Sequence, residues 1–291
     1  MERKMYTSEM RALILFFSFN LVTLMGFSQN LERYNWYFGS SNQAIRFNRT
    51  SGLPVITTKA IPFGGGGSAT ASDPANANLT FYTDGQFVYD ATHAQMPNGM
   101  GLSGNTLANQ PVAICPVPGQ TNKYFIFTST ANFTAGGTIN VSVVDMGLFG
   151  NALFPAPALG DLESKNQPVP GLASRAEAMM IIPHMNGTDF WLITQQVSSS
   201  NYSATLINAA SYSGTYTTTN TNGVSAIPLT AANFSFHAGK KKVAVSAQDT
   251  STDAVILDFN AATGVFSFDR FIFNSGLPTA TNQSLYDIEW S

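Results

Sequence analysis

The sequence predicts an all-β protein, a β-propeller of four-stranded antiparallel blades that is incomplete, with about four to five blades present. Short strands rich in aromatic and β-branched residues alternate with turns rich in Gly, Pro, Asn and Asp. No segment carries the sustained 3.6-residue apolar stripe of an amphipathic helix. Apolar strands recur at separations of 44, 66, 52 and 44 residues, close to a propeller blade of about 40–50 residues. A β-sandwich gives no reason for such a recurring unit.

The recurring strands follow polar or Gly-containing turns, and the repeat is best seen at residues 79–90. There two apolar runs flank Asp84-Gly85, a pair typical of a tight hairpin because Gly accepts a positive φ. The 66-residue interval can hold an insertion at 147–171. The strands of this repeat begin at Leu79, Lys123, Asp189, Lys241 and Leu285.

The N-terminus has the order of a secretory signal peptide. Arg3, Lys4 and Arg11 precede the apolar run 12–25, and Gly26-Phe27-Ser28 provides small residues before polar Gln29. The run is shorter than the ~20 residues of a spanning helix, so a membrane anchor is the less favoured alternative. We therefore expect a signal peptide at 1–28, a partial propeller domain at 29–291, and a cell-surface or extracellular location without a membrane span after cleavage.

The remaining segments are assigned from alternation and turn residues. Tyr34–Gly39 and 44–48 predict a first hairpin, whereas 63–78, 96–101 and 147–171 have the composition of loops and connections. Residues 215–222 fit an edge strand or a loop. The segment 284–291 predicts a strand with no closing turn, so we expect the ring to be cut. The other predicted strands are 112–117, 123–128, 138–145, 175–182, 189–194, 202–207, 243–247, 254–259 and 265–268.

Composition excludes some partners. Only 11% of residues are charged and the net charge is −3, and the one basic run, Lys240-Lys241-Lys242, fits a solvated turn. So little positive charge argues against nucleic acid and anionic membranes. Cys115 is the single cysteine and is expected to be a small buried residue of a strand, because no histidine lies near it in sequence.

Few residues suggest chemistry. The glycine run 64–67 lacks the Lys-Ser/Thr pair of a phosphate loop. Arg175, Glu177 and His184 could face a channel as anion binder, base and acid, or could have a structural role. Asp249, Asp253 and Asp258 could hold calcium, but they do not match an EF-hand. The sequence thus predicts no catalytic, cofactor-binding or metal site, and the other weighed residues are expected to be structural: His93, His237, Tyr82, Tyr89 and Trp191.

Several motifs carry a family resemblance. Asn35-Trp36-Tyr37-Phe38-Gly39, Leu79-Thr80-Phe81-Tyr82-Thr83-Asp84-Gly85 with Met96-Pro97-Asn98-Gly99, Tyr124–Thr128, Val143–Met146 and Gly187–Thr194 resemble the N-terminal propeller region of Bacteroidetes surface proteins that are gliding-motility-associated or PKD-containing. The similarity spans roughly residues 34–291 and implies export through type IX secretion. It implies no catalytic residues, and the family's C-terminal sorting domain is not in this sequence.

The function expected from these observations is that of an exported binding or structural module, in adhesion or protein contact, without catalysis. Its partner would be a protein or a surface glycan, with the secretion machinery engaged in transit. A propeller hydrolase or lactonase and a carbohydrate-binding module remain the alternatives, because propellers host many activities. Convergence of Glu177, His184 and the loop aspartates in one pocket would favour an enzyme, and their dispersal a scaffold.

Overall fold

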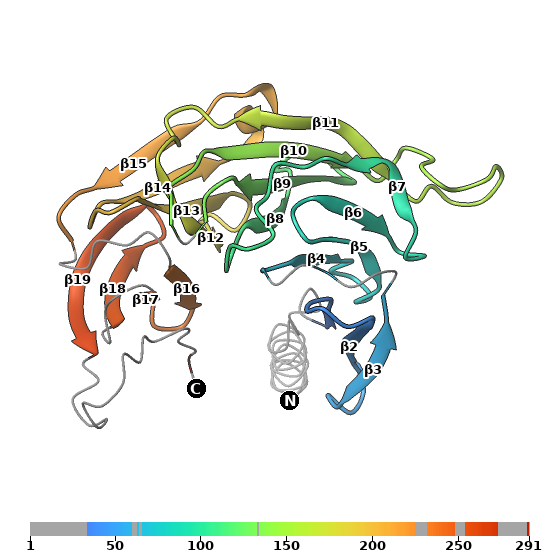
Figure 1. The fold of residues 1–291 in the computed structure, drawn as a ribbon, viewed down its shortest axis with the longest axis horizontal. Coiled ribbons are helices and arrows are strands. Elements are labelled where there is room, and N and C mark those ends of the chain that lie inside the picture. Colours follow the sequence, from blue (N-terminus) through green and yellow to red (C-terminus); the bar gives the residue numbers. More distant parts are fainter. Residues whose placement is uncertain are drawn as a thin grey trace, which may run out of the picture.

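The computed structural model describes residues 34–59, 63, 66–132, 134–224, 232–247, 254–272 and 290, and the predicted signal peptide at 1–28 lies outside these ranges. The described chain forms five antiparallel sheets that follow one another around a common centre as the blades of a β-propeller (Figure 1). The predicted all-β propeller is therefore confirmed. Among the described residues, no helix is long and apolar enough to cross a membrane.

Each blade is a meander of consecutive strands. Blade 1 contains β1 (Asn35–Trp36), β2 (Gln43–Phe47) and β3 (Pro54–Thr58); blade 2 contains β4 (Ala69–Ser72), β5 (Leu79–Thr83), β6 (Phe87–Asp90) and β7 (Gln95–Met100); blade 3 contains β8 (Val112–Pro116), β9 (Lys123–Ser129), β10 (Ile139–Asp145) and β11 (Asp161–Pro168); blade 4 contains β12 (Arg175–Pro183), β13 (Phe190–Gln196), β14 (Tyr202–Ile207) and β15 (Thr217–Thr221); blade 5 contains β16 (Ala232–His237), β17 (Lys242–Ala247), β18 (Ala254–Asn260) and β19 (Val265–Ile272). A 3-10 turn, Ala209–Ser213, joins β14 to β15.

The first strand of each blade is innermost, and it contacts the first strand of the next blade all the way from β1 to β16. Apolar side chains fill the space between adjacent blades. Four separate clusters of buried residues occupy the four interfaces, one per pair of blades. In blade 3, for example, Ile126 packs toward blade 2, while its neighbours Phe125 and Phe127 pack toward blade 4. The core therefore lies between sheets, and every internal blade is apolar on both faces.

The turn of the predicted hairpin forms as the sequence indicates. Gly85 has φ +87°, and the Asp84 carboxylate accepts hydrogen bonds from the backbone N–H groups of Gln86 and Phe87 at 2.9 and 2.8 Å. This Asx-type turn joins β5 to β6. Residues 175–182 are likewise confirmed as a strand, because β12 pairs with β13 from Met179 to Pro183.

Several strands lie in segments that the sequence pattern assigned to loops, and those assignments were wrong. β4 lies within 63–78, β7 overlaps 96–101 and β11 lies within 147–171, while β3 and β16 were not anticipated. β4 is made of small residues, Ala69–Ser72, and β11 is largely polar and exposed after its first two residues. β4, β7 and β11 contain small or polar residues and are only partly buried, so their sequences lack the apolar alternation that marks a half-buried strand.

The recurring strand starts have one structural meaning. Leu79, Lys123, Asp189 and Lys241 lie at or one residue before the second strand of blades 2 to 5. Leu285 lies outside the described residues, as does most of the segment 284–291. Of that segment Trp290 is described, and its indole Nε1 donates to the backbone oxygen of Ser235 in β16 at 3.2 Å.

Candidate binding surface on the first blade

Two buried carboxylates join blade 2 to blade 3. Asp161, at the start of β11, accepts hydrogen bonds from the backbone N–H and the side-chain amide of Asn98 in β7, at 2.9 and 2.7 Å. Asp90, at the end of β6, similarly accepts from the side chain of Asn151 at 2.8 Å. Both carboxylates therefore form hydrogen bonds that link blade 2 to blade 3, with protein groups as the donors.

The structure separates His184 from Arg175 and Glu177, which lie together at the start of β12. Arg175 is buried at the start of β12 and donates to Ser203 Oγ at 2.7 Å and to the Gly171 carbonyl at 2.8 Å. Glu177 is fully buried in the same strand. His184 follows the far end of β12, where its Nδ1 accepts from the backbone N–H of Asn186. Seven residues of extended strand separate Glu177 from His184 by roughly 20 Å, so the predicted trio does not form one pocket.

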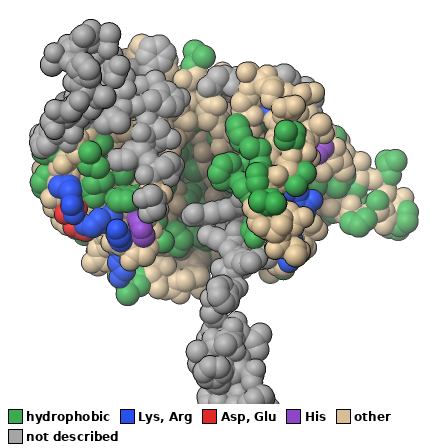
Figure 2. Space-filling view, turned by 90° about the horizontal axis from the view of Figure 1, so that it is seen from below, with side chains coloured by type: hydrophobic (Ala, Val, Ile, Leu, Met, Phe, Trp, Pro, Cys, Tyr) green, Lys and Arg blue, Asp and Glu red, His purple; other side chains and the backbone are tan. Residues whose placement is uncertain are grey.

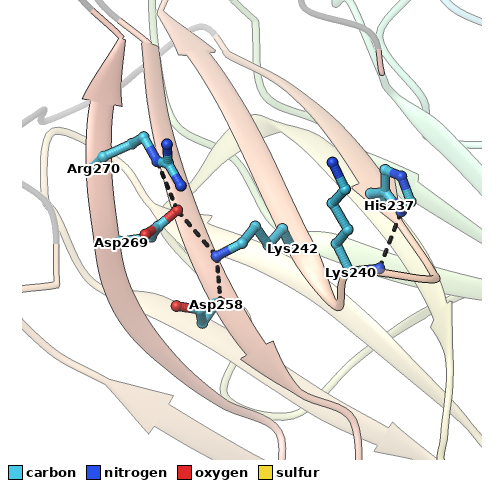
Figure 3. A network of polar contacts seen from close by, with 6 residues as sticks. All are labelled: His237, Lys240, Lys242, Asp258, Asp269 and Arg270. Carbon is cyan, nitrogen blue, oxygen red and sulfur yellow. Dashed lines mark hydrogen bonds and ion pairs between the residues drawn. The ribbon is translucent and has the colours of Figure 1, made fainter. Parts of the chain in front are cut away.

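The proposed calcium site is largely outside the described residues, since Asp249 and Asp253 are not described. Asp258 lies in β18 and pairs with the ammonium of Lys242 at 2.7 Å, and Lys242 also binds Asp269 at 3.0 Å (Figure 3). Arg270 pairs with the same Asp269 at 3.0 Å. The lysine neutralises these carboxylates, and this raises the pKa of Lys242 and lowers that of Asp269.

The three histidines lie on three different blades. His93 follows β6 and lies against Tyr37 and Tyr82. His184 packs on Trp191, and His237 in β16 accepts from the backbone N–H of Lys240 at 3.1 Å (Figure 3). Within the described ranges, no group of three or more His, Cys, Asp or Glu residues is placed to hold a metal ion.

Other weighed residues are part of the core. Cys115 is buried in β8, as expected, and burial raises the pKa of its thiol. Tyr82, Tyr89 and Trp191 are also buried, which confirms that they serve packing. Gly67 of the glycine run lies against the backbone of Asn109, where a Cβ would come within 2.3 Å of the carbonyl oxygen.

Blade 1, like blade 5, has one face that packs against no other blade among the described residues. Its buried face carries Tyr37, which stacks on Tyr82 of β5 with ring centroids 4.5 Å apart, and Asn35, which donates to Ser72 Oγ in β4 at 2.9 Å. On the opposite face, Trp36 is 49% exposed and Ile56 is 70% exposed. These two residues flank Ile45 in one row across the sheet, because Trp36 is paired with Ile45 and Ile45 with Ile56. We call this row, Trp36, Ile45 and Ile56, the apolar row.

The outer edge of blade 1 is also open. Its sheet contains three strands in the described chain, whereas each of the other four contains four, so β3 occupies the outermost position (Figure 1). The hydrogen bonds Asn48 N–H to Leu53 and Lys59 N–H to Asn42 fix the antiparallel register. Since hydrogen-bonded pairs alternate along such a ladder, Val55 and Thr57 bond to β2, and the backbone groups of Ile56 and Thr58 point outward.

A hollow of about 420 Å³ lies on the β2–β3 hairpin. It is lined by Arg46, Phe47, Asn48, Arg49, Thr50, Val55, Ile56 and Thr57. The lining contains two arginines and no carboxylate. Arg46 donates to the side chain of Asn78 at 3.3 Å, and neither arginine takes part in an ion pair with another described residue. The hollow is therefore a positively charged site in a chain whose net charge is −3.

Blades 1 and 5 lie at the two sides of the opening in the ring, and their surfaces contrast. Figure 2 views this side and shows hydrophobic side chains on both blades, whereas Lys and Arg with Asp and His gather mainly over blade 5. On blade 5, Lys242 and Arg270 pair with Asp258 and Asp269, whereas Lys240 and Lys241 form no ion pair with another described residue. Blade 1 combines exposed apolar side chains with a hollow lined by two arginines, and the sequence analysis proposed no site there. The local sequence gives little signal for this surface, because Trp36, Tyr37 and Phe38 are consecutive aromatic residues and only Tyr37 of the three is buried.

Comparisons with known proteins show no relative by sequence, since no protein-family model and no curated protein matches the chain. Two solved structures resemble it in part. One is a candidate 6-phosphogluconolactonase from Bacteroides uniformis ATCC 8492, with 10% identity, a TM-score of 0.40, and coverage of 81% of this chain and 80% of that one. The other is a candidate 6-phosphogluconolactonase from Bacteroides fragilis NCTC 9343, with 12% identity, a TM-score of 0.35, and coverage of 82% and 80%.

Proposed function

We propose that this chain is an exported β-propeller that binds a protein partner through blade 1, outside the cell or at its surface, and that it does not act as an enzyme. The observation that carries the proposal is the combination of an open apolar face, an open strand edge and an arginine-lined hollow on one blade. Exposed apolar surface with a polar rim is typical of protein interaction sites. The leader pattern at 1–28 supports export.

The arrangement of the charged side chains favours binding over catalysis. General acid–base chemistry needs two groups within reach of one substrate, whereas Glu177 and His184 lie roughly 20 Å apart along one strand. Asp90 and Asp161 are committed to inter-blade hydrogen bonds. A lactonase, the alternative function, would need a constellation that these residues do not supply.

Site-specific photo-crosslinking tests the proposed function. A benzoylphenylalanine replaces Ile56, and in a matched control it replaces Leu153, which is 83% exposed on the β10–β11 connection. After incubation with intact cells of the source and with their secreted proteins, we expect a discrete adduct from position 56 and none from position 153. Equal labelling from both positions would contradict a binding surface on blade 1.

Catalysis is tested separately on the purified protein. We expect no hydrolysis of 6-phosphogluconolactone above the spontaneous rate. Turnover that is abolished in Glu177→Gln, in a variant whose circular dichroism and melting temperature match those of the parent, would overturn the proposal in favour of a lactonase.

A further inference from the structure

We propose that the outer edge of β3 accepts an extended peptide segment of a partner protein, as a fourth strand whose side chains alternate between apolar and acidic. This inference rests on the proposed function and names the chemistry of the partner. The added strand would take the outermost position in the sheet of blade 1, which β7, β11, β15 and β19 take in the other blades. Strand addition at an exposed edge is a common mode of peptide recognition, because main-chain hydrogen bonds supply affinity and side-chain pockets supply specificity.

The backbone of β3 is suited to this addition. Ile56 and Thr58 direct N–H and C=O groups outward, and no described strand pairs with them. Pro54 at the start of β3 lacks an N–H, but it also occupies an outward position, where it does not interrupt the bonds to β2. An added strand could thus form hydrogen-bonded pairs at two successive outward residues without disturbing the existing sheet.

The side chains of blade 1 set the expected pattern of the incoming strand. Rows run across the sheet, so an incoming residue beside Ile56 extends the apolar row. The next row on the other face runs from Arg46 to Val55, and an incoming residue beside Val55 would lie near Arg46. Because successive side chains of a strand point to opposite faces, the partner is expected to alternate apolar and acidic residues.

Charge favours this partner over a second copy of the chain. Arg46 and Arg49 line the hollow without a carboxylate, and β3 itself, Pro54–Thr58, contains no acidic residue. Antiparallel pairing of two β3 strands would bring the Arg49 end of one hairpin near the Lys59 end of the other. An acidic segment would instead neutralise both arginines, with bidentate pairing available to each guanidinium.

Fluorescence anisotropy with a defined probe tests the inference. The probe is a fluorescein-labelled peptide, acetyl-Thr-Val-Glu-Val-Glu-Val-Thr-amide, and the controls are the same peptide with Lys in place of Glu and one with N-methylated amides on alternate residues. We expect the acidic probe to bind the intact protein and both controls to fail. Raising the salt concentration should weaken binding, because exposed ion pairs are screened.

Variants of the protein locate the site. Arg46→Gln and Arg49→Gln should each weaken binding about threefold, whereas Lys240→Gln, an exposed cation on blade 5, should leave it unchanged. Thr58→Pro removes an outward N–H and should abolish binding with little change in melting temperature. If Thr58→Pro fails to fold, the N-methylated peptide decides the same point.

Three outcomes would overturn the inference. The acidic and Lys-containing probes could bind equally; binding could be insensitive to both arginine substitutions; or the protein could dimerise through β3, as a sedimenting dimer lost in Arg49→Glu or Thr58→Pro would show. Failure of the probe together with a specific Ile56 crosslink would reject only the acidic strand and leave the proposed function standing. Loss of the crosslink as well would reject both.

Discussion

Asp161 illustrates how single side chains hold adjacent blades together. Its two oxygens accept three hydrogen bonds, two from Asn98 across the blade interface and one from the backbone of Leu162 at 2.9 Å. The carboxylate is buried, and hydrogen bonds to a buried charged group are stronger than those between neutral groups. The sequence could not indicate this contact, because Asn98 and Asp161 are separated by 63 residues and belong to segments that resemble loops.

We predict that Asp161→Ala lowers the free energy of unfolding by about 1.5–3 kcal/mol, since two partly buried hydrogen bonds from Asn98 to a charged acceptor are lost. The control is Asp189→Ala, whose carboxylate bonds to Asn186 within its own turn and should cost less than about 1 kcal/mol. Urea unfolding followed by fluorescence measures both. Equal losses in the two variants would show that the inter-blade contact has no special weight.

Tyr89 gives a prediction of pH dependence. Burial, assisted by nearby Asp84, raises the pKa of Tyr89 to about 12. The unfolded chain ionises near its ordinary value of about 10, so the folded state keeps a proton that the unfolded state loses. Stability is therefore unaffected below about pH 10 and falls as the pH rises from about 10 to 12. Tyr89→Phe should flatten this alkaline loss, measured by circular dichroism across that range; an unchanged slope would contradict the assignment.

At the scale of the elements, the sequence predicted the middle strands of blades 2 to 5 and also β1, β2, β8, β12 and β19, whereas it missed β3, β4, β7, β11 and β16. The second strand of each of blades 2 to 5 is apolar and buried on both faces, and the spacing of these strands is the repeat that the sequence analysis recognised. β11 and β15 are polar because their outer edges meet solvent, and β4 is short and made of small residues near the ring's centre. Pairing register and inter-blade contacts depend on residues far apart in sequence, so local patterns could not supply them.

The innermost strands also need partners for their inward edge. Gln110, which precedes β8, donates to the carbonyl of Phe234 in β16 at 3.0 Å and accepts from its N–H at 2.9 Å. The side-chain amide of Gln110 thus forms the two hydrogen bonds that a backbone amide of a neighbouring strand would form, and it links blade 3 to blade 5. The two residues are 124 positions apart, and a lone Gln carries no sequence signal for this role.

We predict that Gln110→Ala leaves the amide of Phe234 open to solvent and lowers the free energy of unfolding by about 1–2 kcal/mol. Hydrogen exchange at Phe234 should accelerate, while exchange at Val243 within the same sheet stays slow. Gln120→Ala, an exposed turn residue, is the matched control. Unchanged exchange at Phe234 in Gln110→Ala would mean that the contact contributes nothing to this edge.

At the scale of the whole molecule, five blades share four apolar interfaces, and the two blades beside the opening each retain a face without a neighbouring blade. The face on blade 5 carries the Lys242 network beside apolar residues such as Ala244 and Ile256, whereas the face on blade 1 carries the apolar row and is continuous with an edge that no described strand pairs. The sequence predicted the propeller and a binding role, but it could not place the surface, because exposure of the apolar row depends on the arrangement of complete blades.

The most direct measurement of the central claim is residue-resolved amide exchange along β3 in the isolated protein. If β3 is an open edge, the amides of Ile56 and Thr58 exchange rapidly, while those of Val55 and Thr57, bonded to β2, are protected. Addition of the acidic probe should then slow exchange at Ile56 and Thr58. Protection of all four amides before any peptide is added would show that the edge is already paired and would contradict the account.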